Sequence, residues 1–310
     1  MELEADEGPV GVVTRRRGPW RQALARFRRR PLGVAAFAIV ALLFLVALLA
    51  PVLAPYPVGQ SFIELIQHPQ APLAAHHLFG TDVLGHDYLT EMLFAVRETM
   101  LSAFFCAVFA TVVGVAVGLV AGYVHGPFEA MSSFLSRVVV TVPAIAVLGF
   151  VSTRYEFLMT PFQDALWLAL LFWPGVARVV STAVASLRNR DFVDAAHAAG
   201  ASTPRILLRH LLPNVSGPIV VAATWVVGQA IVVVATVQYL GYSYNEAHQP
   251  TLGGLVADGT NAPSLILTAN VGLGAVWWLY VIPSVALVVL LLAVTFLGDS
   301  LDEALNPAAV

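Results

Sequence analysis

The residues best suited to chemistry in this chain lie in one polar stretch, residues 191–214, between long apolar segments. It begins with two carboxylates, Asp191 and Asp194, and continues with two arginines and two histidines. Charged groups at this density can form charge-assisted hydrogen bonds with another protein. No loop or span orders a nucleophile, a base and an orienting acid together, as an intramembrane hydrolase would need. We therefore expect this stretch to bind a partner rather than to catalyse a reaction.

Helix signals divide the stretch into two short helices joined by a turn. The first helix starts at about Asp191 and stops at Gly200, since glycine readily adopts the left-handed backbone that ends helices. Thr203 can cap the second helix, Pro204 suits its first position, and the helix should end before Pro213. The alanines of the first helix keep its sides small, so that another surface can approach closely. A polar helix-turn-helix between apolar segments predicts a docking element for a partner in water.

Composition places the elements around this stretch in a membrane. Of the 310 residues, 58% are hydrophobic and 11% are charged, and the mean hydropathy is +0.80. A soluble domain is about 25% charged. All 16 basic residues are arginine, so the chain has neither a phosphate-loop lysine nor a Schiff-base lysine, and any ATP chemistry must belong to a partner. The single cysteine, Cys106, lies in an apolar run and is predicted to be a small core residue.

Six apolar segments approach the roughly 20 residues that a membrane-spanning helix needs. Their predicted bounds are 32–54, 99–123, 134–151, 162–182, 215–239 and 275–297, the third being short. Apart from Asp164, near the start of the fourth, the spans contain no acidic residue, whereas charges within the membrane mark the proton and ion pathways of transporters. The sequence therefore predicts an all-α membrane protein with six transmembrane helices, and argues against a proton-coupled secondary transporter.

Glycine recurs at every fourth position in part of the second predicted span, at Gly114, Gly118 and Gly122. This spacing lets two helices approach closely within a membrane, because no side chain separates the backbones. The same small residues could instead line a translocation path. We favour close packing, and the sequence leaves both interpretations open.

The chain divides into an N-terminal region, residues 1–31, and a transmembrane domain, residues 32–310. The first 14 residues show no periodicity and are predicted to be a disordered tail. Eight arginines follow, with apolar residues such as Trp20 and Leu24 at helical spacing between them. This pattern predicts an amphipathic helix at the membrane surface. Because a span follows at once, we expect its arginines to meet membrane lipid rather than nucleic acid.

The arginines also predict the orientation of the chain, since arginines near span ends favour the cytoplasm. The eight N-terminal arginines and six others fall on one side of the six predicted spans. Only Arg97 and Arg154 fall on the other side. Both termini and the loop at about 188–214 are therefore predicted to be cytoplasmic. The long connections 55–97 and 240–275 are predicted to face outward.

Metal-capable side chains gather in the first outer connection, namely His76, His77, Asp82, His86 and Asp87. Zinc and nickel sites need convergent ligands, whereas adjacent histidines usually point apart. We therefore expect a solvated loop here and no metal site. The sequence alone does not assign a role to the three histidines.

The polar stretch resembles the EAA loop of ABC-importer permeases. In that family an acidic-Ala-Ala segment is followed by a glycine and then by a tail with an isoleucine and a proline. The matching residues here are Asp194, Ala195, Ala196, Gly200, Ile206 and Pro213. The family's usual glutamate is Asp194 here, which keeps the charge on a shorter arm. The resemblance implies a cytoplasmic coupling helix-turn-helix that sits in a groove on a separate ATPase subunit.

The wider chain, about residues 15–307, is similar to one branch of these permeases, the C-type subunits of dipeptide, oligopeptide and nickel importers. The matching motifs lie at 50–55, 77–87, 118–123, 143 and 298–307. Four places depart from the family's usual pattern. His86 replaces an arginine, Arg137 stands where an acidic residue is usual, and Val234 replaces a glutamate. The usual Leu-Gly-Leu-Gly is Leu-Gly-Tyr-Ser here, at residues 240–243. The departures concern substrate and outer loops, and leave the docking loop unchanged.

The resemblance implies the type I permease fold and a permease subunit of an ATP-driven importer of di- or oligopeptides. A sister permease would complete the translocation path, and an extracytoplasmic substrate-binding protein would deliver the substrate. Two ATPase subunits would hold ATP and Mg²⁺ and would move the 191–214 loop as a lever, so this chain would be no enzyme and would hold no cofactor. The chain would lie in the inner membrane of a bacterium. A nickel or other small-solute importer is the alternative within the family, and a secondary transporter or channel is the alternative outside it.

Overall fold

The structure, a computed structural model, describes residues 19–73, 76–124, 126–154, 161–242, 250–265 and 273–305. The described residues form a bundle of helices, joined at one end by a loop with two isolated β-bridges. Five helices are long and apolar enough to cross a membrane, namely α2 (Pro31–Leu53), α3 (Tyr88–Tyr123), α6 (Pro161–Leu187), α10 (Ser216–Tyr239) and α12 (Trp278–Leu305). The pair α4 (Pro127–Thr141) and α5 (Ala144–Arg154) adds a sixth span if it is counted as one. The predicted all-α membrane fold is confirmed.

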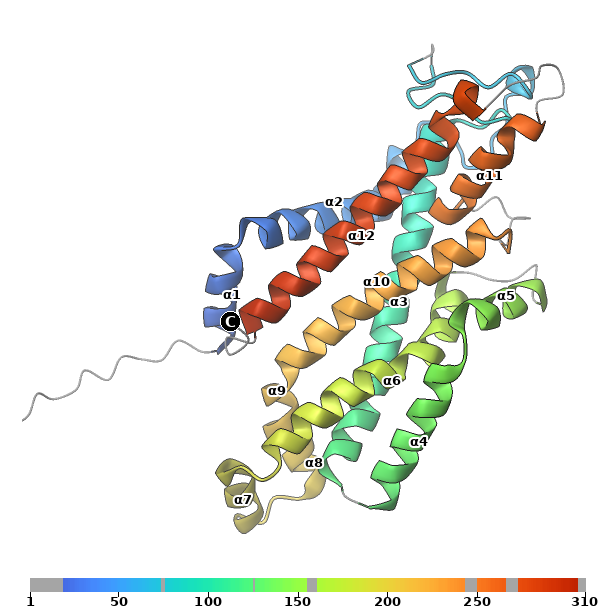
Figure 1. The fold of residues 1–310 in the computed structure, drawn as a ribbon. Coiled ribbons are helices and arrows are strands. Elements are labelled where there is room, and N and C mark those ends of the chain that lie inside the picture. Colours follow the sequence, from blue (N-terminus) through green and yellow to red (C-terminus); the bar gives the residue numbers. More distant parts are fainter. Residues whose placement is uncertain are drawn as a thin grey trace, which may run out of the picture.

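Helix α3 runs through the middle of the bundle and packs against α2, α6 and α10 (Figure 1). Its repeated glycines face α6. A Cβ atom added at Gly114, Gly118 or Gly122 would lie 2.5–2.7 Å from the nearest atom of α6. No side chain fits at that distance, so the glycine repeat serves the close packing of α3 and α6 and does not line an open path.

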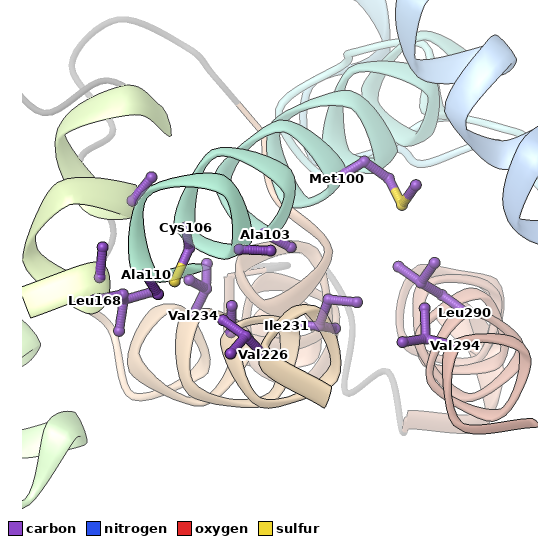
Figure 2. Close-up of a cluster of buried hydrophobic side chains, with 14 of the residues drawn as sticks. Met100, Ala103, Cys106, Ala110, Leu168, Val226, Ile231, Val234, Leu290 and Val294 are labelled. Atoms are coloured by element: carbon purple, nitrogen blue, oxygen red, sulfur yellow. The ribbon is translucent and has the colours of Figure 1, made fainter. Parts of the chain in front are cut away.

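Apolar side chains from α3, α6, α10 and α12 form one buried core. Figure 2 shows small side chains of α3, such as Ala103 and Cys106, turned toward the larger Ile231 and Val234 of α10. Alternation of small and large side chains lets the helices interdigitate without voids. Cys106 is fully buried, as predicted for a core residue.

Helix α3 starts at Tyr88, about eleven residues before the predicted start of the second span. Asp87 caps the helix by accepting a hydrogen bond from the Thr90 backbone N–H at 2.9 Å. The first turns carry the buried carboxyl side chains of Glu91 and Glu98, which lower the local hydropathy on which the predicted start depended. The expectation that the spanning helices contain no acidic residue is therefore wrong for α3, and the preceding connection is shorter than predicted.

The third predicted span, residues 134–151, consists of two helices, α4 and α5, which are bent by 71° relative to each other. The break falls at Val142 and Pro143. A proline disfavours helical backbone at the residue before it, and Val142 is extended, with φ −77° and ψ 122°. The prediction of one continuous helix was therefore wrong in shape.

The N-terminal helix α1 (Pro19–Arg28) forms as predicted and lies beside the end of α12 (Figure 1). Arg26 donates a hydrogen bond from Nη1 to a carbonyl oxygen near the end of α12 at 3.3 Å, and Arg30 forms an ion pair with Glu303. Glu303, near the end of α12, therefore pairs with Arg30 just after α1, and not with Arg205 or Arg209 of the polar stretch.

The end of the bundle opposite α7 holds two further elements (Figure 1). One is the folded loop between α2 and α3, with a short 3₁₀ helix at Ile63–Leu65. The other is α11 (Leu252–Leu265), which packs against α10 and α12. The second outer connection, predicted as a loop, thus contains a helix. The predicted 1–14 tail lies outside the described residues.

Candidate functional site

The polar stretch forms a compact unit at one end of the bundle (Figure 1). It consists of α7 (Asp191–Ala198), α8 (Thr203–Arg205), a wide π-helical segment (Ile206–Leu211) and α9 (Leu212–Asn214), which leads directly into α10. The predicted helix-turn-helix is therefore present. Its structural details explain how it is held and what it exposes.

Gly200 ends α7 as predicted, with a positive φ of 77°. The Gly200 N–H donates to the His197 carbonyl oxygen at 2.9 Å, and the Ala201 N–H donates to the Ala196 carbonyl oxygen at 3.0 Å. These two bonds are those of a Schellman motif, which satisfies the last carbonyl groups of a helix. The turn is thus fixed by backbone hydrogen bonds, and it depends on a residue that tolerates positive φ.

The second half of the unit differs from the prediction in two respects. Ser202 rather than Thr203 occupies the N-cap position. The helix also does not end before Pro213. The backbone widens to a π turn in which the Leu212 N–H donates to the Leu207 carbonyl oxygen, five residues back. Because a proline lacks an N–H and clashes with the preceding turn, this widening lets the chain continue into α9 without a break.

Burial divides the six residues that match the EAA pattern into two groups. Ala196 and Ile206 are buried, together with Val193, and they fasten the unit to the bundle. Asp194 and Ala195 are exposed on the outer face of α7. The remaining two residues, the turn glycine and the proline of α9, are also exposed. The unit therefore has an apolar inner side and an acidic, small-residue outer side.

Polar contacts from neighbouring helices also hold the unit in place. The Tyr123 hydroxyl, at the end of α3, lies 2.6 Å from Nε2 of His197, and the two rings stack at 6.2 Å between centroids. Arg188, just after α6, donates from Nη1 to the Gly122 carbonyl oxygen at 3.1 Å. Sequence reasoning missed both contacts, because the partners are 74 and 66 residues apart and no motif links them. A displacement of α7 would therefore be transmitted directly to α3 and α6.

The Asp194 carboxylate has no hydrogen-bond or ion-pair partner within the part of the chain that the structure describes. In particular, it does not pair with Arg205, an arginine of its own loop. An exposed carboxylate near the first turn of a helix is instead available to a group from outside.

At the other end of the bundle, carboxylates and histidines pair with one another inside the folded loop. Nδ1 of His77 lies 2.8 Å from Oδ1 of Asp87, and Nδ1 of His86 lies 2.8 Å from Oδ2 of Asp82. His77 and Asp87 are buried, at 5% and 2% exposure. The expectation of a solvated loop is therefore wrong for these buried residues, whereas His76 and other parts of the same loop are exposed.

Each of the two histidines pairs with its own carboxylate, so the four side chains do not converge on one point. No group of three potential metal ligands comes together among the described residues. The third histidine, His76, has a positive φ of 73°, and its carbonyl oxygen accepts a hydrogen bond from the Tyr56 hydroxyl at 3.2 Å. The Asp82 carboxylate, hydrogen-bonded to the ring, raises the pKa of His86 above its ordinary value although burial opposes this. The cluster stabilises the loop.

Comparison with known proteins adds a family context. Residues 114–309 match the family described as binding-protein-dependent transport system inner membrane component, and residues 18–72 match the N-terminal transmembrane domain of oligopeptide transport permease C. The oligopeptide transport system permease protein OppC of Escherichia coli K12 is 31% identical over 292 residues, 94% of this chain and 92% of that protein. OppC of Mycobacterium tuberculosis H37Rv is 30% identical, covering 92% of this chain and 93% of that protein.

A putative peptide transport system permease protein of Brucella suis biovar 1 is 30% identical, over 90% of each chain. Among solved structures, a chain of the inward-facing MetNI methionine ABC transporter superposes with a TM-score of 0.53 at 21% identity. The match covers 71% of this chain and 98% of that one. At this identity the similarity concerns the fold, and it agrees with a helical membrane domain of the type I importer class.

Proposed function

Because this chain belongs to the family of inner-membrane components of binding-protein-dependent transport systems, we propose that it is the permease subunit of an ATP-driven importer of short peptides. The peptide substrate is supported by three relatives of about full length whose names specify peptide or oligopeptide transport. None of these three names specifies nickel, so the small-solute alternative has less support.

The α7 unit is proposed to be the surface on which a separate ATPase subunit docks. One observation carries this assignment: α7 presents the carboxylate of Asp194, which has no partner among the described residues, on an exposed face while its other face is buried against the bundle. A partner groove can enclose such a helix without first breaking internal bonds. ATP and Mg²⁺ would be held by that partner, since this chain contains no lysine for a phosphate loop.

Coupling follows from how the unit is fastened. ATP-driven closure of two ATPase subunits would displace α7, and the His197–Tyr123 contact would carry the displacement to the end of α3. The close α3–α6 contact at the glycine repeat makes those helices move together. Binding energy at α7 would thereby shift an equilibrium between inward-facing and outward-facing arrangements of this subunit and a sister permease.

The α7 end is proposed to be cytoplasmic, in a bacterial inner membrane, and the folded loop before α3 to face outward toward the substrate-binding protein. The distribution of arginines supports this orientation. In a Cys106→Ala background, Ser202→Cys and Glu64→Cys should react with a membrane-impermeant thiol reagent from opposite sides, since both side chains are exposed. Labelling of both positions from outside would contradict this orientation.

Transport itself is tested by reconstitution. The chain is purified with the sister permease and ATPases encoded beside it, placed in proteoliposomes, and supplied with the binding protein and a radiolabelled tripeptide. We expect uptake that requires both ATP and the binding protein. Uptake without ATP would favour a secondary transporter or channel. ATP-driven uptake of nickel but not of peptide would favour the small-solute importer.

A further inference from the structure

A pocket of about 250 Å³ lies between α3, α4 and α6, above the α7 end of the bundle. Its wall carries two arginines, Arg137 of α4 and Arg178 of α6, and five hydroxyl side chains, three from α4 and two from α6. The other three lining residues are small and apolar, and none of the ten is acidic. The pocket therefore presents hydrogen-bond donors and positive charge in a membrane domain.

The two guanidinium groups are available to a ligand. Both side chains are exposed, and within the described residues neither has an ion-pair or hydrogen-bond partner. Arg137 lies ten residues after the start of α4, and Arg178 lies nine residues before the end of α6. At 1.5 Å per residue, each is roughly 14 Å from that helix end. An arginine on a helix of a membrane domain normally faces protein or a water-filled cavity, because burial in hydrocarbon is costly.

The surface of the pocket differs from the surfaces suited to lipid chains. The exposed faces of α2 and α12 carry apolar side chains such as Leu45, Val288 and Leu292. The α4–α6 pocket carries hydroxyls and guanidiniums instead. Water and a polar solute fit such a wall, whereas acyl chains do not.

We infer that this pocket binds the carboxylate of a peptide substrate as it passes through the permease. This inference rests on the proposed peptide-import function and deepens it by naming the chemical group that is recognised. An arginine fork matches a carboxylate with two parallel hydrogen bonds, and neighbouring hydroxyls can donate further bonds. The pocket is smaller than most ligand sites, so it holds one end of an extended peptide. Partial exposure keeps binding weak enough for release, as transport requires.

The test uses the purified permease–ATPase complex in nanodiscs without the binding protein, so that only the permease selects. Binding of two fluorescent tripeptides is compared, one ending in a carboxylate and one in an amide. We expect the wild type to bind the carboxylate form about tenfold more tightly, the factor for one charge-assisted hydrogen bond. The double variant Arg137→Gln, Arg178→Gln should bind both forms equally. Arg154→Gln, an exposed arginine outside the pocket, should keep the wild-type preference.

Two results would overturn the inference. One is the absence of a carboxylate preference in the wild type, or its survival in the double variant. The other is a lipid result: mass spectrometry finds an anionic phospholipid bound to the wild type but not to the double variant, and the wild type shows no preference between the two peptides. The pocket would then be a site for a lipid headgroup. ATP-driven uptake of both peptides by the wild type is the control. Uptake persists if only the pocket inference is wrong, whereas neither peptide is taken up if the proposed peptide-import function is wrong.

Discussion

The two ends of the bundle use acidic residues in opposite ways. At the end opposite α7, Asp87 is 2% exposed, pairs with His77 and caps helix α3. At the α7 end, Asp191 and Asp194 are exposed in the first turn of a helix, and Asp194 has no partner among the described residues. A carboxylate near a helix N-terminus is favourable in both places. The difference is whether the protein supplies the second partner itself.

This contrast separates structural carboxylates from the carboxylate that we propose to dock a partner, called below the docking carboxylate. A buried, paired carboxylate costs stability when it is removed, because its partner is left buried and unpaired. An exposed, unpaired one costs little in the isolated subunit and matters only when a partner encloses it. Substitutions at the two ends should therefore have effects on different measurements, and the following predictions test that separation.

The largest effect is expected from Asp87→Ala. The change removes the partner of buried His77 and both hydrogen bonds from Thr90 to Oδ2, at 2.9 Å each. We expect a loss of at least about 3 kcal/mol in the free energy of unfolding, which is the usual cost of breaking a buried pair. The loss of stability is measured by thermal unfolding in detergent, monitored by size-exclusion chromatography. Asp87→Asn keeps a side-chain oxygen that can cap α3, so its stability should lie between those of wild type and Asp87→Ala. An unfolding temperature equal to that of wild type would contradict the structural role.

Asp194→Ala should leave unfolding unchanged and weaken the ATPase complex by about tenfold or more. The carboxylate becomes shielded only on docking, and loss of one partner of a shielded charged pair costs about 2–5 kcal/mol, while about 1.4 kcal/mol is tenfold. Titrated pull-down of the ATPase at equal membrane expression measures the affinity. Asp194→Glu keeps the charge and should bind nearly as wild type. Full ATPase retention by Asp194→Ala would show that this carboxylate merely solubilises the helix.

Gly200→Val tests whether the α7 turn must keep its shape. No atom lies within 4 Å of a Cβ placed there, so only the positive φ of 77° opposes the substitution. Strain of about 1–2 kcal/mol is expected for a β-branched residue in this conformation. Substrate-stimulated ATPase activity should fall several-fold while the protein remains inserted. Gly200→Asn is the matched control, because asparagine tolerates positive φ. Equal activity of the valine and asparagine variants would remove the turn from the coupling mechanism.

The sequence predicted the elements that depend on local signals. Long apolar runs suffice to identify α2, α10 and α12, because composition alone decides whether a helix can cross a membrane. The end of α7 was predictable for the same reason, since Gly200 is the residue that a left-handed turn requires. The acidic-Ala-Ala pattern predicts the proposed docking face, and the structure distinguishes exposed Asp194 from buried Ala196 within it.

What the sequence could not predict depends on contacts between distant residues. The start of α3 was missed because Glu91 and Glu98 look like loop residues until their burial is known. The His197–Tyr123 contact spans 74 residues and needs the packing of α3 beside the α7 unit. The sequence argued against a metal site in the loop, but it could not predict that two of its histidines pair with two carboxylates. Only the directions of the side chains in the folded loop decide that pairing.

The smallest effect on stability is expected from substitution of His86. Its pairing with Asp82 depends on pH, so this prediction sharpens the comparison between the two ends of the bundle. Hydrogen bonding to Asp82, aided by the charge of Glu91, raises the pKa of His86 above 6.5. A raised folded-state pKa means that the stabilisation is fully present below the unfolded pKa and is lost as pH rises through the folded one. The unfolding temperature of wild type should therefore exceed that of His86→Gln most at about pH 5.5, with the difference shrinking toward about pH 8.5. The effect on the free energy of unfolding should be on the order of 1 kcal/mol, the usual net contribution of one hydrogen bond.

The matched control is His68→Gln, because the His68 side chain is exposed in the same loop and has no partner among the described residues. Its unfolding curve should follow wild type at every pH. The Asp194→Ala variant should likewise show the wild-type pH dependence, because no histidine within the described part of the chain pairs with that carboxylate. A pH-independent difference for His86→Gln would mean that the ring acts by packing alone. An altered pH dependence in Asp194→Ala, matching that of His86→Gln, would mean that the two ends are electrostatically linked, and the separation of structural carboxylates from the docking carboxylate would then fail.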